Sequence, residues 1–183
     1  MSAYAALAPR IPSVTGDGVA LVLAAQRGDR AAFAELYTRH ARAVHGILLS
    51  LVPFGEVDDL VQDVFVAAME RLPSLREPAA FGGWLAAMAR NRAVDYFRRS
   101  PGRTVELMDH MAVTAPDRSE ALAIMAIIRS LPEAYRETLT LRLVEGMTGP
   151  EISEATGLTE GSVRVNLHRG MKQLRERLER RSA

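Results

Sequence analysis

Apolar residues recur every three to four positions along most of this 183-residue chain, and this spacing is the strongest constraint on its fold. Such spacing is typical of helices that bury one face. No segment shows the strict apolar–polar alternation that a half-buried strand requires. Clusters of Pro and Gly at 53–55, 73–78 and 100–102 separate the helical segments. We therefore expect an all-α protein.

The helical segments form two groups, which predict two small helical domains joined by a flexible linker. A flexible tail covers residues 1–18, and the first domain covers 19–100. Residues 101–117 contain Pro and Gly without sustained periodicity, so we interpret them as the linker. The second domain covers 118–183. The predicted helices lie at about 19–27, 30–51, 57–72, 79–99, 117–130, 132–144, 150–156 and 160–180.

The composition excludes several classes of protein. The chain has no Cys, so disulfide scaffolds, thiolate metal sites and Cys nucleophiles are impossible. No apolar run approaches the ~18–20 residues of a membrane-spanning helix, and the first 18 residues lack the apolar stretch of a signal peptide. We expect a cytosolic protein without membrane insertion, metal or cofactor. Without GxxxxGK[ST], GxGxxG or HExxH, we also expect that it is not an enzyme.

Charge is balanced overall but segregated along the chain. Lys and Arg number 23 against 22 Asp and Glu, yet residues 56–77 are mostly acidic, whereas 90–103 and the last helix are mostly basic. Two basic helices suggest two contacts with a polyanion. Helical surfaces are charged anyway, and Arg favours helix C-termini, so ordinary solvated surface remains an alternative. The acidic helix is likewise either a solvated face or a docking face for a basic partner.

Residues 148 to about 178 have the pattern of a helix-turn-helix. Thr148 and Glu151 are spaced as a capping box, and a tight turn at 157–159 precedes a longer basic helix. One stripe of this second helix is predicted to pack on the domain interior: Val163, Leu167, Met171, Leu174 and Leu178.

The opposite side of the second helix, near its start, is polar and basic. A recognition helix presents this end to the major groove, where Arg and Asn suit guanine and adenine edges. We therefore predict DNA binding, with a helix-turn-helix used only for protein contacts as the alternative. The candidate residues are Ser162, Arg164, Val165, Asn166, His168 and Arg169.

Three segments in this order carry a family resemblance: Asp58-Asp-Leu-Val-Gln-Asp-Val-Phe65, Phe81-Gly-Gly-Trp-Leu-Ala-Ala-Met-Ala-Arg-Asn-Arg-Ala-Val-Asp-Tyr-Phe-Arg-Arg99, and Leu131-Pro-Glu-Ala-Tyr-Arg-Glu137 followed by the helix-turn-helix. Together they resemble the extracytoplasmic-function (ECF, group IV) sigma factors of the sigma-70 family. The resemblance covers roughly residues 20–180. It implies two helical domains, sigma region 2 and sigma region 4.

The resemblance also implies partners and site residues. The partners would be the RNA polymerase core, through the β′ clamp helices and the β flap, promoter DNA, and an anti-sigma factor. Region 4 would read the −35 element, although Val165-Asn166 replaces a Ser-Arg common in the family and leaves its sequence open. Polymerase contacts would be Asp59, Gln62 and Asp63; a pocket for a flipped −10 base would involve Ser74, Arg76 and Glu77; region 2 contacts with DNA would be Asn91, Arg92, Arg98 and Arg99.

Two other functions remain open on the sequence. One is a helix-turn-helix regulator that never joins polymerase, although such a regulator has no need of the acidic helix or of the segment 81–99. The other is a sigma-like interaction protein that sequesters an anti-sigma factor. We expect such a mimic to lose the basic faces, and this chain keeps both.

Overall fold

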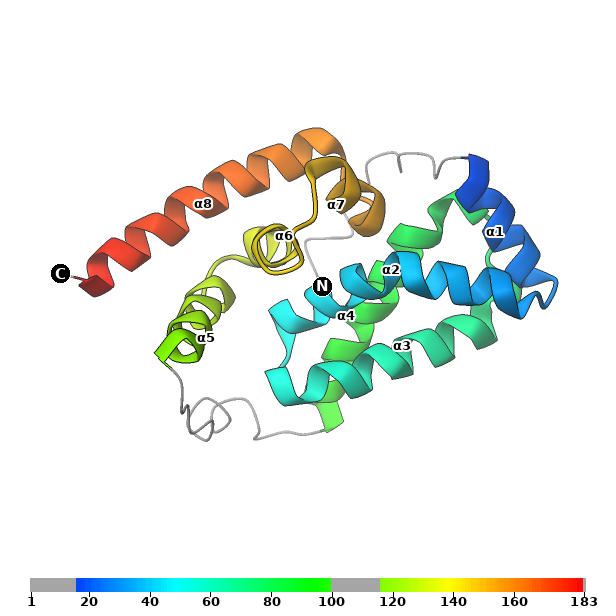
Figure 1. Ribbon diagram of the computed structural model, residues 1–183, viewed down its shortest axis with the longest axis horizontal. Coiled ribbons are helices and arrows are strands. Elements are labelled where there is room, and N and C mark those ends of the chain that lie inside the picture. Colours follow the sequence, from blue (N-terminus) through cyan, green and yellow to red (C-terminus); the bar gives the residue numbers. More distant parts are fainter. Residues whose placement is uncertain (1–15, 100–115, 183) are drawn as a thin grey trace.

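A computed structural model describes residues 16–99 and 116–182, with side chains for 17–99 and 120–181. All regular elements in these two stretches are helical, which confirms the all-α prediction (Figure 1). The predicted linker and N-terminal tail lie largely outside the described residues. The α-helices are α1 (Gly16–Gln26), α2 (Arg30–Leu51), α3 (Val57–Arg71), α4 (Phe81–Arg99), α5 (Pro116–Arg129), α6 (Glu133–Leu143), α7 (Gly149–Thr156) and α8 (Glu160–Ser182).

Helices α1 to α4 pack as one bundle around the apolar face of α2. Asp29 caps α2 as predicted, because its carboxylate accepts hydrogen bonds from the backbone N–H groups of Ala31 and Ala32 at 2.9 and 3.1 Å. Helix α1 begins three residues before its predicted start at Val19. Asp17 stands in this added first turn, where a negative charge is favourable, and its carboxylate pairs with Arg39 of α2 at 3.0 Å.

Short 3-10 turns flank α3 and α4. The turn η2 (Phe54–Glu56) precedes α3, while η3 (Leu72–Ser74) and η4 (Pro78–Ala80) connect α3 to α4. Each of them contains a proline or follows one, which suits the fixed φ of proline at the start of a helical turn. The connection between α3 and α4 is therefore a structured loop.

Helices α5 to α8 form the second domain, with a small core of its own. Its buried apolar side chains are Ile128, Leu131, Leu139 and Leu174. At Gly170 a Cβ would lie 3.0 Å from Leu139 and 3.1 Å from Tyr135, so the close approach of α8 to α6 is favoured by a glycine at this position. No described helix is long and apolar enough to cross a membrane.

The two domains share one continuous apolar core, an arrangement the sequence did not predict. Leu141, Ile152 and Val163 of the second domain are fully buried together with residues of α2, α3 and α4. Helices α6 and α7 accordingly lie between α8 and the first bundle (Figure 1). At Gly82 of α4 a Cβ would stand 2.5 Å from the carbonyl oxygen of Glu154, so this glycine admits the backbone of α7.

Candidate nucleic-acid interface

The helix-turn-helix forms as predicted from α7, a tight turn and α8. Thr148 and Glu151 make the complete capping box, and Gly157 ends α7 in the left-handed region with φ 75°. Thr159 caps α8 by accepting a hydrogen bond from the backbone N–H of Ser162 at 3.1 Å. The start of α8 is therefore fixed by local hydrogen bonds on both sides of the turn.

The predicted inner stripe of α8 is correct at most positions and wrong at Met171. Val163 and Leu174 are buried, whereas Met171 is 37% exposed. Gly170 takes the inner position instead, where a Cβ would lie only 3.0 Å from the side chain of Leu139 on α6. Met171 is thereby displaced to a groove beside the C-terminal end of α6, where it lies near Leu143.

The predicted DNA-contacting side of α8 is accessible. Arg164, Val165, His168 and Arg169 are exposed, in two consecutive turns of the helix. Ser162 and Asn166 are half-buried, and the hydroxyl of Ser162 lies 2.8 Å from that of Thr159. The structure therefore brings together an exposed basic surface at the N-terminal end of a helix that rests on its domain through the opposite face. This arrangement suits entry into a major groove.

The candidates on α4 differ in their surroundings. Asn91 and Arg99 are exposed, and Arg98 is exposed while paired with Asp95 at 2.9 Å. Arg92 is half-buried, and its Nε donates to Asp63 of α3 at 3.1 Å. A residue expected to contact DNA thus pairs with one expected to contact polymerase.

The outer surface of α3 is mixed acidic and apolar. Asp59, Gln62 and Asp63 are exposed as expected. Val66 and Met69, 54% and 55% exposed, continue the same side of the helix. Neither residue was among the predicted polymerase contacts, although their spacing from Gln62 of four and seven positions already places them on this side. Exposed apolar side chains beside carboxylates are suited to a protein partner.

The η3–η4 loop presents the three candidates for the −10 pocket to solvent. Ser74, Arg76 and Glu77 are all exposed. The Ser74 hydroxyl donates to the carbonyl oxygen of Arg71 at 2.7 Å, which ties the loop to the end of α3.

Polar contacts hold the two domains together around their shared core. Arg90 of α4 pairs with the buried carboxylate of Glu137 of α6. His45 Nδ1 lies 2.7 Å from Glu145, and this hydrogen bond, with the nearby acidic charges, raises the pKa of His45. Arg129 of α5 donates to the carbonyl oxygens of Leu49 and Val52 at the end of α2. Burial of its guanidinium lowers the pKa of Arg129.

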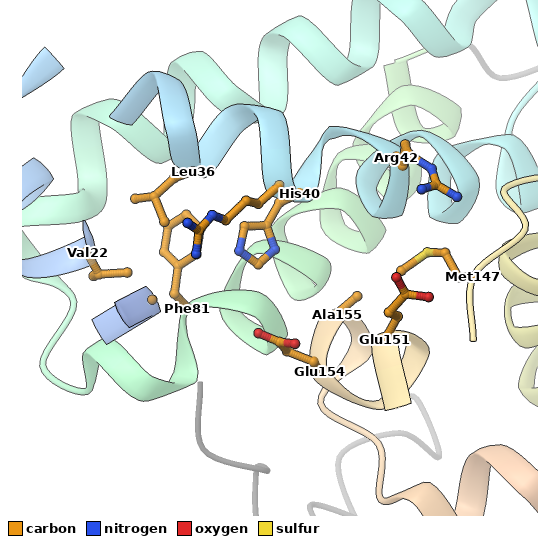
Figure 2. Close-up of a pocket in the computed structure, with 11 residues that line it drawn as sticks. Val22, Leu36, His40, Arg42, Phe81, Met147, Glu151, Glu154 and Ala155 are labelled. Carbon is orange, nitrogen blue, oxygen red and sulfur yellow. The ribbon is translucent and has the colours of Figure 1, made fainter. Parts of the chain in front are cut away.

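A pocket of about 280 Å³ lies between α2, α4 and α7 (Figure 2). The ring of His40 lies beside that of Phe81, with centroids 5.1 Å apart, and Glu154 and Ala155 of α7 line the other side. Burial, and then the charge of Arg39, lower the pKa of His40 to about 4. His40 is therefore neutral at physiological pH. Within the described stretches no group of His, Asp and Glu side chains is arranged to hold a metal ion.

Comparison with protein families finds two matches in the two domains. Residues 36–101 match Sigma-70 region 2, and residues 121–174 match Sigma-70, region 4. The chain is 34% identical over 168 residues to the ECF RNA polymerase sigma factor SigF of Caulobacter vibrioides, covering 88% of this chain and 93% of SigF. The chain belongs to the ECF sigma factors. The predicted family is thereby confirmed, and a sigma factor is not an enzyme.

Further relatives agree with this assignment. The ECF RNA polymerase sigma-E factor of Escherichia coli is 32% identical over 167 residues, covering 81% of this sigma factor and 87% of that one. Among solved structures, CnrH in complex with the cytosolic domain of CnrY superposes with a TM-score of 0.62 at 27% identity. That superposition covers 88% of this sigma factor and 97% of the CnrH chain. The relatives thus span both domains.

Proposed function

We propose that this sigma factor divides promoter recognition between separate surfaces of its two domains. In region 2, the outer side of α3 binds the β′ clamp helices of the polymerase core. The η3–η4 loop takes up a base flipped from the −10 element, and the C-terminal part of α4 holds the opened strand. In region 4, α8 reads the −35 element as duplex and the domain contacts the β flap. The factor acts with polymerase in the cytoplasm.

One observation carries this proposal: the acidic–apolar side of α3 and the basic start of α8 are both exposed, on different helices of different domains. Val66 and Met69 add apolar area to the acidic side of α3, as a protein interface requires. Arg164 and Arg169 add positive charge where a helix enters a groove. Strand opening costs stacking energy, which a pocket for an unstacked base offsets.

Paired charge reversals test the division. Polymerase core is reconstituted with each variant and footprinted on promoter fragments selected from genomic DNA by the wild-type holoenzyme. Arg169→Glu is expected to abolish protection at −35 while core affinity stays unchanged. Asp59→Arg is expected to lower core affinity at least tenfold. Asp59 has no ion-pair partner among the described residues, so its reversal is cleaner than that of Asp63, which would also release Arg92. Equal loss of both properties in both variants would contradict the proposal.

Regulation by an anti-sigma factor is the second part of the proposal. CnrH, which superposes on both domains, was solved with the cytosolic domain of CnrY bound, and this likeness supports a comparable partner here. Such a partner would compete with polymerase for the factor. Capture on tagged full-length protein, followed by competition with polymerase core, tests this part; a captured protein that leaves core binding unchanged would contradict it.

A further inference from the structure

Gln26, the last residue of α1, reaches from its helix to the backbone of the η3–η4 loop. Its side-chain nitrogen Nε2 donates to the carbonyl oxygen of Leu72 at 3.0 Å and to that of Leu75 at 2.8 Å. These two carbonyls stand at the two ends of the η3 turn, where the chain leaves α3. A single amide group therefore bridges the start of the loop from behind.

Further contacts also fix the η3 turn and the start of the loop to the bundle. The backbone N–H of Leu75 donates to the Leu72 carbonyl at 3.0 Å and closes the turn. The side chain of Leu72 is buried, and Leu75 packs against the core. Helix α1, which carries Gln26, is anchored by Val22, whose side chain has no exposed surface. The inner side of the loop is thus fixed to the bundle.

The outer side of the loop carries the proposed base pocket. Ser74, Arg76 and Glu77 are exposed, whereas Gln26 is half-buried behind the turn. Gln26 therefore does not need to touch DNA to affect the pocket. It sets the backbone from which the pocket side chains project, and a site holds its ligand well only when the groups behind it fix its geometry.

We propose that Gln26 is a positioning residue for recognition of the flipped −10 base. This inference rests on the proposed role of the η3–η4 loop. Both N–H groups of the amide are needed, because the two carbonyls lie three residues apart and each accepts one hydrogen bond from the amide. Without them Leu72 keeps only the hydrogen bond from the Leu75 N–H, the Leu75 carbonyl is no longer tied to α1, and the loop samples other conformations. Recognition of the −10 base is therefore weakened, while DNA binding by the distant α8 surface is unaffected.

The test measures the penalty for removing one base. Holoenzyme is titrated with the single −10 strand of a selected promoter, intact or with an abasic site at each position in turn. The readout is the ratio of affinities for intact and abasic strand at the position with the largest ratio. Gln26→Met removes both donors at similar size, and is expected to reduce this ratio about five- to tenfold. Gln26→Asn keeps the amide but shortens the side chain, so it is also expected to reduce this ratio.

Two further variants separate positioning from a general loss of structure. Gln26→Lys restores donors on a flexible stem and is expected to recover part of the ratio. Gln173→Met makes the same chemical change on α8, where Gln173 is also half-buried, and is expected to keep the wild-type ratio. Core affinity and protection at −35 are expected to stay unchanged in all four variants.

Three results would overturn the inference. Gln26→Met and Gln26→Asn could both keep the wild-type ratio, which would overturn the role of Gln26 alone. They could lower core affinity and −35 protection together with the ratio, which would show a merely structural role. Wild-type holoenzyme could show no position-specific abasic penalty, and then the proposed pocket fails as well, so the two failures are distinguishable.

Discussion

Arg90 and Glu137 form a two-pronged ion pair that joins region 2 to region 4. Arg90 donates from Nε to Glu137 Oε2 at 2.9 Å and from Nη2 to Oε1 at 2.6 Å. The Glu137 side chain is 3% exposed, so its charge depends on this partner. A buried pair of this kind adds little net stability over apolar residues, but the loss of one partner is costly.

Replacement of Glu137 by Ala is expected to separate the two domains. It removes the carboxylate that Arg90 pairs with across the interface, and the loss of one partner of a buried pair costs roughly 3–5 kcal/mol. Small-angle scattering should report a larger radius of gyration. The control is Glu133→Ala, an exposed carboxylate in the first turn of the same helix. An unchanged radius of gyration for Glu137→Ala would count against an interface that depends on this pair.

The substitution Gly82→Ala is also expected to separate the two domains, in this case through a steric clash. The added methyl group would stand 2.5 Å from the Glu154 carbonyl oxygen, which α7 can relieve only by moving away. Alanine favours the helix more than glycine, so α4 itself should remain folded. Scattering and far-UV circular dichroism check both points. Gly149→Ala, where nothing lies within 4 Å of the new methyl, is the control; a compact Gly82→Ala protein would refute the prediction.

Stability is expected to fall on the acid side because of His40. Its pKa is about 4 in the folded chain against an ordinary 6.5, so between these values the unfolded chain binds a proton that the folded chain does not. The free energy of unfolding should therefore decrease by about 1.4 kcal/mol per pH unit below ~6.5. His45, with a raised pKa, acts in the opposite sense and loses its contribution as pH rises through that pKa.

Urea unfolding at about pH 7 and about pH 5 measures this dependence. Between these two pH values, His40 should lower the free energy of unfolding of the wild-type protein by roughly 2 kcal/mol. The His40→Gln variant lacks this contribution, so its free energy of unfolding should fall by roughly 2 kcal/mol less than that of the wild type. The comparison between the two proteins cancels the other charged groups around the pocket, namely Arg39, Arg42, Glu151 and Glu154. Parallel pH profiles for the two proteins would contradict the assignment.

Loss of the capping box is expected to weaken the helix-turn-helix. Thr148 donates from its backbone N–H to the carboxylate of Glu151 at 2.6 Å, a hydrogen bond that lowers the pKa of Glu151. Thr148→Ala removes the side-chain half of the box and should cost about 1 kcal/mol in urea unfolding. Thr38→Ala, an exposed threonine within α2, should change stability by less than about 0.5 kcal/mol. Equal losses would argue against a specific cap.

Local features of this sigma factor were predictable from its sequence. Asp29 and Thr148 cap the helices they precede, and the turn at Gly157 separates the two helices of the motif. These elements depend on hydrogen bonds between residues a few positions apart, which a sequence pattern records directly. The exposed candidates on α3 and α8 follow from the same helical periodicity.

Tertiary structure decided the contacts between distant segments. Arg90 and Glu137 are 47 positions apart, and nothing in either local pattern indicates that their charges meet. Met171 lost its predicted inner place because α6 approaches α8 at Gly170. Gln26 and the Leu72 carbonyl, 46 positions apart, belong to elements whose patterns are complete without each other. Sequence periodicity fixes which side of a helix is apolar, whereas the fit of two complete surfaces determines which side chains meet across them.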